Sequence, residues 1–174
     1  MASKYVIVGV IDYGVGNLGS VLRALEELGV TPVRLRRATD VRQPDALILP
    51  GVGGFTECKE LLDEGNWSEA IKEATSVYDK PLLGICLGMQ LLADSSEEGA
   101  NGEGGTPGLG LIPGHVASLK ELGCSLRVPH VGWNSVYSQS RSPLMKAIPD
   151  GTDFYFVHSY AFVPRDPVDV LATT

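Results

Sequence analysis

The sequence has few basic residues and no long hydrophobic run, the features expected of proteins that bind polyanions or span membranes. Its 174 residues carry 14 Lys+Arg against 21 Asp+Glu, a formal charge of −7, and no basic run is longer than Arg36-Arg37. Such a charge balance argues against a nucleic-acid or anionic-lipid surface. The longest weakly charged apolar stretch, Pro81 to Ala93, is far shorter than the roughly 20 residues that a membrane helix needs. The sequence therefore predicts no nucleic-acid partner and no membrane span.

Cysteine is also scarce. The three cysteines (Cys58, Cys86 and Cys124) are odd in number and far apart, with no C-x-x-C pair and no histidine at zinc-finger spacing. This pattern predicts neither a disulfide framework nor a metal site, and it is typical of a reducing, cytoplasmic compartment. The apolar segment Tyr5 to Ile11 is followed by Asp12 and a glycine turn rather than a cleavage site, so we interpret it as a strand and not as a signal peptide.

Continuous apolar runs alternate with amphipathic segments in the first half of the chain. This alternation predicts a largely parallel sheet covered on both faces, in a chain long enough for one domain with one core. The expected strands are Tyr5–Ile11, Val30–Leu35, Ala46–Leu49 and Pro81–Ile85, and the expected helices are Leu18–Leu28, Phe55–Leu62, Trp67–Thr75 and Leu87–Leu92.

After Ala93 the pattern changes. Residues 95–108 are rich in Gly, Glu and Ser and predict a loop. Short strand-like segments then follow one another, which is most simply an antiparallel extension of the parallel sheet. They are Gly110–Leu119, Ser125–Val128, Trp133–Tyr137, Phe154–Val163 and Val168–Thr173, with one possible helix at Pro143–Ile148.

The segment Gly84-Ile-Cys-Leu-Gly88 has the form G-x-nucleophile-x-G between a buried strand and a helix. A sharp strand-to-helix turn forces the central residue into strained backbone angles and turns its side chain outward, and the flanking glycines let neighbouring backbone pass close by. Cys86 is therefore a candidate nucleophile, and the Leu87 N–H would point to where an oxyanion forms. The alternative is that Cys86 is a small buried hydrophobe. Cys58 and Cys124 lack flanking glycines, and for them the buried interpretation is favoured.

A second glycine cluster, Gly14-Val-Gly16-Asn-Leu-Gly19, matches G-x-G-x-x-G between a strand and a helix. It raises the alternative of an NADP-binding Rossmann protein, with Arg36-Arg37 receiving the 2′-phosphate. Against this alternative, Asp12-Tyr13 separates the strand from the first glycine, and Cys86 would have no role.

Several blocks together resemble a known family. Gly84-Ile-Cys-Leu-Gly-Met-Gln90 resembles the nucleophile motif of class I (triad) glutamine amidotransferases. Four further blocks resemble the glutaminase subunit of imidazole glycerol phosphate synthase: Ile11–Ser20, Leu49–Phe55, Pro129–Asn134 and Phe154–Tyr160. The resemblance covers essentially the whole chain and implies the three-layer α/β fold of this family over a single domain, residues 1–174.

The resemblance implies a glutaminase that releases ammonia through a Cys86 thioester, without a cofactor. It places Leu87 and the Gly51-Val52-Gly53 segment in the oxyanion hole, where a peptide flip would complete the hole. It also assigns the binding of L-glutamine to four residues, Gln90, Glu98, Ser159 and Tyr160.

The implied partner is a cyclase subunit, a (β/α)8 barrel that takes the ammonia and forms a heterodimer with the glutaminase to make imidazole glycerol phosphate and aminoimidazole carboxamide ribotide in histidine biosynthesis. Trp133, Asn134, Tyr155 and Asn17 fall in the blocks that face it. From the residues alone, Trp133 and Tyr155 are equally well interpreted as core aromatics.

The family's base and orienting acid lie in a C-terminal His-Pro-Glu motif, which these 174 residues do not contain. Their only histidines are His115, His130 and His158, and none precedes Pro-Glu. We therefore expect the chain to be incomplete at its C-terminal end and to hydrolyse glutamine very poorly on its own. A non-catalytic module that binds the partner is the corresponding alternative.

Overall fold

The fold is centred on a four-stranded parallel sheet. The computed structural model describes residues 6–100, 102 and 104–174, so Tyr5, the first residue of the expected N-terminal strand, lies outside the described residues. The strand order is β2-β1-β3-β4, formed by β1 (Ile7–Ile11), β2 (Thr31–Leu35), β3 (Ala46–Gly51) and β4 (Leu82–Cys86). All three pairings are parallel. The four strands expected from the sequence in this half are all present.

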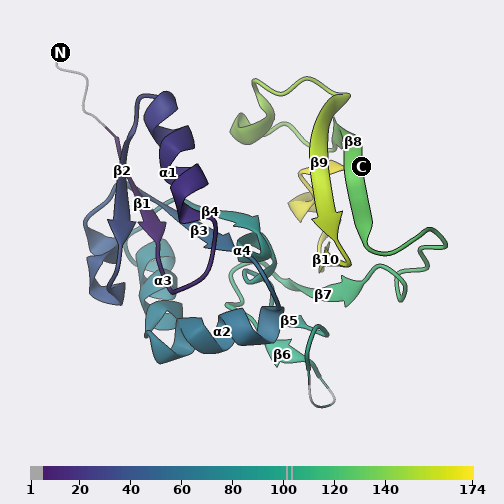
Figure 1. Cartoon of the computed structure of the whole chain (residues 1–174), viewed down its shortest axis with the longest axis horizontal. Coiled ribbons are helices and arrows are strands. Elements are labelled where there is room, and N and C mark those ends of the chain that lie inside the picture. The colour runs from purple at the N-terminus through teal and green to yellow at the C-terminus, as the bar shows by residue number, and fades with distance from the viewer. Residues whose placement is uncertain (1–5, 101, 103) are drawn as a thin grey trace.

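Helices cover the two faces of this sheet. Helix α1 (Leu18–Glu27) lies on one face, and α2 (Phe55–Glu64) and α3 (Trp67–Ser76) lie on the other (Figure 1). This arrangement follows from right-handed crossovers, because the chain moves from β1 outward to β2 and then returns past β1 to β3 and β4. Helix α1 buries none of its residues completely, whereas α2 and α3 bury Phe55, Leu62, Trp67 and Ile71 against β3. The main core therefore lies between the sheet and the α2–α3 layer.

The later strands do not continue the parallel sheet. One separate sheet has the order β10-β7-β5-β6, and another has the order β11-β8-β9. The bounds are β5 (Ser95–Ser96), β6 (Thr106–Pro107), β7 (Gly114–Ser118), β8 (His130–Ser138), β9 (Thr152–His158), β10 (Tyr160–Pro164) and β11 (Ala172–Thr173). The expected extension of one sheet is thus replaced by two additional sheets, each with antiparallel pairs.

Several expected elements in this half are shorter or differently bounded. The expected strand 154–163 is broken at Ser159, so its two parts pair with different partners, β8 and β7. Residues 125–128 form no strand. The expected helix 143–148 is a short 3-10 turn, Pro143–Met145, and a second such turn spans Pro167–Asp169. A further 3-10 turn, Ala38–Arg42, follows β2.

The β8–β9 hairpin stands apart from the helix-covered sheet, beside the C-terminus (Figure 1). Its register pairs His130 with His158 and Trp133 with Tyr155. Successive side chains point to opposite faces of a strand, so Val131, Trp133, Tyr155 and Val157 share one face of the hairpin. This face is largely exposed. In the described part of the chain, no helix is long and apolar enough to cross a membrane.

Candidate functional site

Cys86 lies at the turn between β4 and α4 (Leu87–Gln90), as the sequence predicts. Its backbone angles are φ 54° and ψ −119°, and its side chain is exposed. Among the described residues, the non-glycine residues with a positive φ are Asn66, Asp79 and Cys86. Such a conformation costs about 1–3 kcal/mol and persists only where the surrounding structure imposes it. The alternative of a buried Cys86 is therefore excluded, because the thiol is displayed at the end of the sheet.

Glycine is required on both sides of Cys86. A Cβ on Gly84 would collide with the Met89 backbone, and a Cβ on Gly88 would collide with the Leu49 carbonyl oxygen on β3. The helix that begins directly after the nucleophile thus packs its backbone against two neighbouring strands. This close approach is the physical basis of the glycine spacing. The helix itself ends at Gln90, two residues earlier than the sequence predicts.

The segment after β3 runs beside the nucleophile. The β3–β4 ladder extends to the pair Gly51–Cys86, and a Cβ on Gly51 would approach the Gly88 nitrogen to 2.6 Å. The Leu47 N–H donates to the Pro81 carbonyl at 2.8 Å. This bond lies at the other end of the same ladder. Leu87 and the Gly51–Gly53 segment are therefore adjacent.

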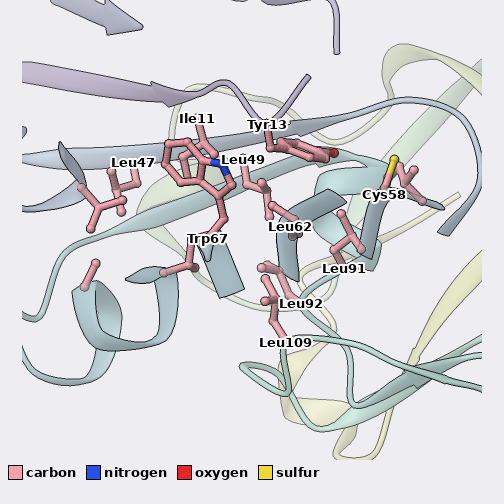
Figure 2. Packing of buried hydrophobic residues seen from close by; sticks show 14 of the residues in the cluster. Ile11, Tyr13, Leu47, Leu49, Cys58, Leu62, Trp67, Leu91, Leu92 and Leu109 are labelled. Carbon is pink, nitrogen blue, oxygen red and sulfur yellow. The ribbon is translucent and has the colours of Figure 1, made fainter. Parts of the chain in front are cut away.

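Two buried side chains hold the carbonyls on either side of Gly51. Tyr13 Oη donates to the Pro50 carbonyl at 3.0 Å, and Cys58 Sγ donates to the Val52 carbonyl at 3.3 Å. In Figure 2 the Tyr13 hydroxyl points toward the Cys58 sulfur. Both side chains are almost fully buried. The sequence predicts that Cys58 is buried but gives no indication that it bonds to this segment, because the contact joins separate elements.

Glu98 lies at the N-terminus of α2. Its Oε2 accepts from the Phe55 N–H at 3.0 Å, and its main-chain carbonyl accepts from Thr56 Oγ1 at 2.9 Å. These contacts place the Glu98 carboxylate beside the residues that follow Gly53. Burial raises the pKa of Glu98 above its ordinary value of 4.5, and the bond from Phe55 only partly opposes this shift.

The raised pKa of Glu98 predicts a pH-dependent stability. The folded state holds this proton more tightly than the unfolded state, so the resulting stabilisation is complete below about pH 4.5 and is lost as the pH rises through the raised pKa. Glu98→Gln keeps an acceptor for Phe55 without a charge. We expect the free energy of unfolding of Glu98→Gln, relative to the original protein, to increase from pH 4.5 toward neutrality in urea titrations. A difference that stays constant over this range would contradict the prediction.

Gln90 and the Ser159-Tyr160 segment meet beside α4. Gln90 Nε2 donates to the Tyr160 carbonyl at 3.1 Å, and the Ser159 carbonyl accepts from the Leu119 N–H at 2.9 Å. The structure thus brings Gln90 on α4 together with Tyr160, which follows Ser159 directly in the chain. Glu98 approaches from the α2 side, through its contact with Phe55.

The three histidines make their contacts away from the Cys86 thiol. His130 Nδ1 and His158 Nε2 are 3.0 Å apart, and His158 Nδ1 lies 2.9 Å from the Tyr160 carbonyl. His115 is an exposed residue of β7. Within residues 6–100, 102 and 104–174, no histidine hydrogen-bonds to Cys86 Sγ. The structure therefore adds no reason to assign any of them as the base.

The expected partner-facing residues are exposed. Trp133 is 68% and Tyr155 is 56% exposed, and their rings meet edge to face with centroids 5.5 Å apart. Both aromatics thus lie outside the core. Asn134 is exposed on the opposite face of β8, and Asn17 caps α1 by accepting from the Ser20 N–H at 3.4 Å. Trp133 and Tyr155 form one surface, whereas Asn17 belongs to the helix-covered sheet.

The second glycine cluster forms the turn between β1 and α1, with Gly14 and Gly16 at positive φ. Arg37, one of the two residues considered for a 2′-phosphate, is paired instead with Asp40 at 3.0 Å. Asp12 likewise pairs with Arg34 at 2.7 Å. These ion pairs give the segment a structural role, and nothing in them favours a dinucleotide site.

Comparison with known proteins agrees with this geometry. A family model described as glutamine amidotransferase class-I matches residues 9–174. The chain is 46% identical over 167 residues to "imidazole glycerol phosphate synthase subunit HisH 1" of Prochlorococcus marinus (strain MIT 9313), covering 95% of this chain and 77% of that protein. It is 44% identical over 167 residues to the HisH subunit of Moorella thermoacetica, with 96% and 76% covered.

Solved structures show the same fold at lower identity. One described as a glutamine amidotransferase has a TM-score of 0.73 at 21% identity, covering 96% of this chain and 79% of that chain. PurLQS from Thermotoga maritima has a TM-score of 0.69 at 19% identity, covering 97% and 74%. The match over residues 9–174 and the identities of 44–46% establish that this chain belongs to the class I glutamine amidotransferase family of enzymes, with relatives among the HisH subunits of imidazole glycerol phosphate synthase.

Proposed function

We propose that the protein is the glutaminase subunit of an imidazole glycerol phosphate synthase. It hydrolyses L-glutamine to glutamate and ammonia, and the ammonia passes to a cyclase subunit. The observation that carries this proposal is the exposed Cys86 thiol at a strained strand-to-helix turn, directly before the Leu87 N–H, in a chain 46% identical to a HisH subunit. We also propose that residues 1–174 belong to a single amidotransferase domain, which the match of one family model to residues 9–174 supports.

The reaction proceeds through two acyl transfers. The Cys86 thiolate attacks the side-chain amide carbon of glutamine, and a tetrahedral oxyanion forms. When the C–N bond breaks, the departing nitrogen takes up one proton and leaves as ammonia, so a glutamyl thioester remains on Cys86. Water then adds to the thioester, the C–S bond breaks, and glutamate is released with the Cys86 thiolate restored. Of the two protons that this water supplies, one replaces the proton taken up by ammonia and the other is released when the new carboxyl group of glutamate ionises. We assign the nucleophile to this chain and assign no base among His115, His130 and His158.

The oxyanion is stabilised by backbone N–H groups in this proposal. The Leu87 N–H is one donor, and the Gly51–Gly53 segment supplies the other. The Gly51–Val52 peptide rotates in this proposal, so that the Val52 N–H becomes the second donor. A single oxyanion donor typically contributes about 10²–10³ to the rate.

Glutamine is held by groups on both sides of the nucleophile. Glu98 supplies a carboxylate, the natural counter-ion for the α-ammonium group of the substrate. Gln90, Ser159 and Tyr160 supply amide, hydroxyl and main-chain groups near α4. In this arrangement the substrate lies between the α2 N-terminus and β10, with its amide carbon over Cys86.

The cyclase subunit, a (β/α)8 barrel, would form a heterodimer with this chain through the face of the β8–β9 hairpin that carries Trp133 and Tyr155. The family resemblance also assigns Asn134, on the other face of β8, and Asn17 to the partner interface. Support comes from the large exposed apolar side chains gathered on one face of the hairpin, Val131, Trp133, Tyr155 and Val157. Exposed aromatic pairs of this kind commonly provide most of the binding energy of an interface. Direct transfer of ammonia between subunits keeps it unprotonated and nucleophilic.

The interface proposal predicts the effect of removing the indole. We expect Trp133→Ala to weaken binding of the cyclase by about 2 kcal/mol, roughly thirtyfold in Kd, in calorimetric titrations. Because Trp133 is 68% exposed, the unfolding midpoint should change little. Leu28→Ala is the matched control, since Leu28 is 77% exposed at the end of α1. Equal affinities for Trp133→Ala and Leu28→Ala would remove Trp133 from the interface.

The function is tested by supplying nitrogen to the cyclase in two forms. In every turnover measurement the protein carries, after Thr174, the C-terminal His-Pro-Glu segment of a class I relative, because we assign no base within residues 1–174. With this extended protein present, glutamine should support cyclase turnover and release one glutamate for each product, whereas residues 1–174 alone should support far less. Ammonium salts should support the cyclase without this protein. If the two proteins bind each other and yet no glutamyl thioester ever forms on Cys86, the chain is a non-catalytic binding module and the proposal fails.

A further inference from the structure

The segment beside the nucleophile is held at two alternate carbonyls. Tyr13 Oη binds the Pro50 carbonyl at 3.0 Å, and Cys58 Sγ binds the Val52 carbonyl at 3.3 Å. Tyr13 follows β1, whereas Cys58 lies near the start of α2, so two different elements of the core reach the same short segment. Carbonyls two residues apart along an extended chain point the same way, and here both point into the core.

Both side chains remain hydrogen-bond donors over the physiological pH range. Burial is the largest cause of the raised pKa of the Tyr13 phenol. It is also the largest cause of the raised pKa of the Cys58 thiol. Tyr13 is 5% and Cys58 is 1% exposed, so water does not compete for either contact. The two donors therefore act as permanent attachments of the segment to the core.

The peptide between these attachments is held differently. Among the described contacts no side chain bonds to the Gly51 carbonyl, and Val52 is 49% exposed. Beyond it, Gly53 has φ +94° and open space where a Cβ would be. Without the bond from Cys58, the chain from Gly51 to Gly53 would have no side-chain attachment among the described contacts.

We propose that Tyr13 and Cys58 are positioning residues that fix the Pro50 and Val52 carbonyls, so that reorientation is confined to the single Gly51–Val52 peptide between them. This inference rests on the proposed function, in which that peptide turns its N–H toward the oxyanion. When only one peptide can rotate, its N–H reaches a single well-defined orientation. A hinge spread over two peptides distributes the N–H over many orientations, and fewer of them stabilise the oxyanion.

The inference predicts a change in kcat without a change in KM. Neither side chain belongs to the proposed glutamine-binding set, so the KM for glutamine should stay within about twofold. In the complex of the extended protein with the cyclase, Cys58→Ala should lower the kcat for glutamine about tenfold. Cys58→Ser keeps a donor at the same atom and should retain most of the kcat. Tyr13→Phe, which removes only the hydroxyl, should resemble Cys58→Ala, and Cys124→Ala is the control for loss of a thiol elsewhere.

The confinement is measured directly, and without substrate, by ¹⁵N relaxation dispersion of the whole chain. In the original protein and in Cys58→Ser, exchange should be largest at the Val52 amide. In Cys58→Ala it should extend to the Gly53 amide. The inference is overturned if Gly53 behaves alike in Cys58→Ala and Cys58→Ser, or if KM changes instead of kcat. Absence of a Cys86 thioester in the original protein would refute the proposed function, and the relaxation data would still decide whether Cys58 confines the motion.

Discussion

Replacing Cys86 by serine, in the protein extended by the His-Pro-Glu segment, is expected to lower glutamine-dependent turnover of the complex with the cyclase by about 10⁴-fold or more. A serine hydroxyl at this strained turn is a far weaker nucleophile than a thiolate, and the proposed reaction has no other covalent route. Ammonia-dependent turnover by the cyclase should be unchanged, because that reaction bypasses the nucleophile. Glutamate release and cyclase product are the two quantities to measure.

The matched control for this loss is Cys124→Ser. Cys124 is partly buried in a turn after β7 and takes no part in the proposed site. Its variant should keep the turnover of the original protein within about twofold. Retention of more than about a tenth of the glutamine-dependent rate by Cys86→Ser would show that the nucleophile has been assigned to the wrong residue.

The second large effect concerns folding rather than chemistry. Gly88→Ala is expected to lower the free energy of unfolding by about 3 kcal/mol, and the unfolding midpoint by roughly 10 °C, because the new methyl group would collide with the Leu49 carbonyl oxygen. This collision is with backbone, so a side-chain rotation cannot relieve it. To make room, α4 must move away from β3, and Cys86 and Leu87 move with it. Thermal and urea unfolding provide the measurement.

Gly19→Ala is the matched control for that substitution. Gly19 lies in α1, and a Cβ there would meet nothing within 4 Å. Alanine favours a helix over glycine by about 1 kcal/mol, so this variant should be as stable as the original protein or slightly more stable. If Gly88→Ala and Gly19→Ala unfold alike, the close approach of α4 to β3 does not constrain the fold.

The first half of the fold is predictable from the sequence because its signals are local. Each strand from β1 to β4 is an apolar run, and glycine or proline punctuates the chain around it. The turn at Cys86 is predicted for the same reason, since Gly84 and Gly88 report a steric requirement within five residues. The spacing of these two glycines therefore predicts the strained backbone conformation of Cys86.

The second half is predicted less well because strand pairing is not local. The run from Phe154 to Val163 looks like one strand, yet Ser159 interrupts it and its two parts pair with β8 and β7. Nothing in the residue pattern states which strand lies beside which. The same limit applies to Trp133 and Tyr155, because alternation along a strand separates two faces without showing which one is covered.

The positioning role of Cys58 illustrates what the sequence does not reveal about the site. Cys58 lies on the buried side of α2, and a buried cysteine is usually only a small hydrophobe. Its bond to Val52 exists because α2 begins at Phe55, shortly after Val52, and folds back over the segment. A sequence signal for this role is absent. The contact between Glu98 and Phe55, which joins residues 43 positions apart, is equally unpredictable.

We propose that Cys86, alone among the three cysteines, is the thiol that reacts with glutamine. It is tested most directly by treating the protein with the glutamine analogue 6-diazo-5-oxo-L-norleucine and mapping the alkylated peptides by mass spectrometry. We predict modification of Cys86 only, suppressed by excess L-glutamine and not by D-glutamine. Modification spread over Cys58, Cys86 and Cys124, or labelling of Cys86 that L-glutamine does not suppress, would contradict the claim.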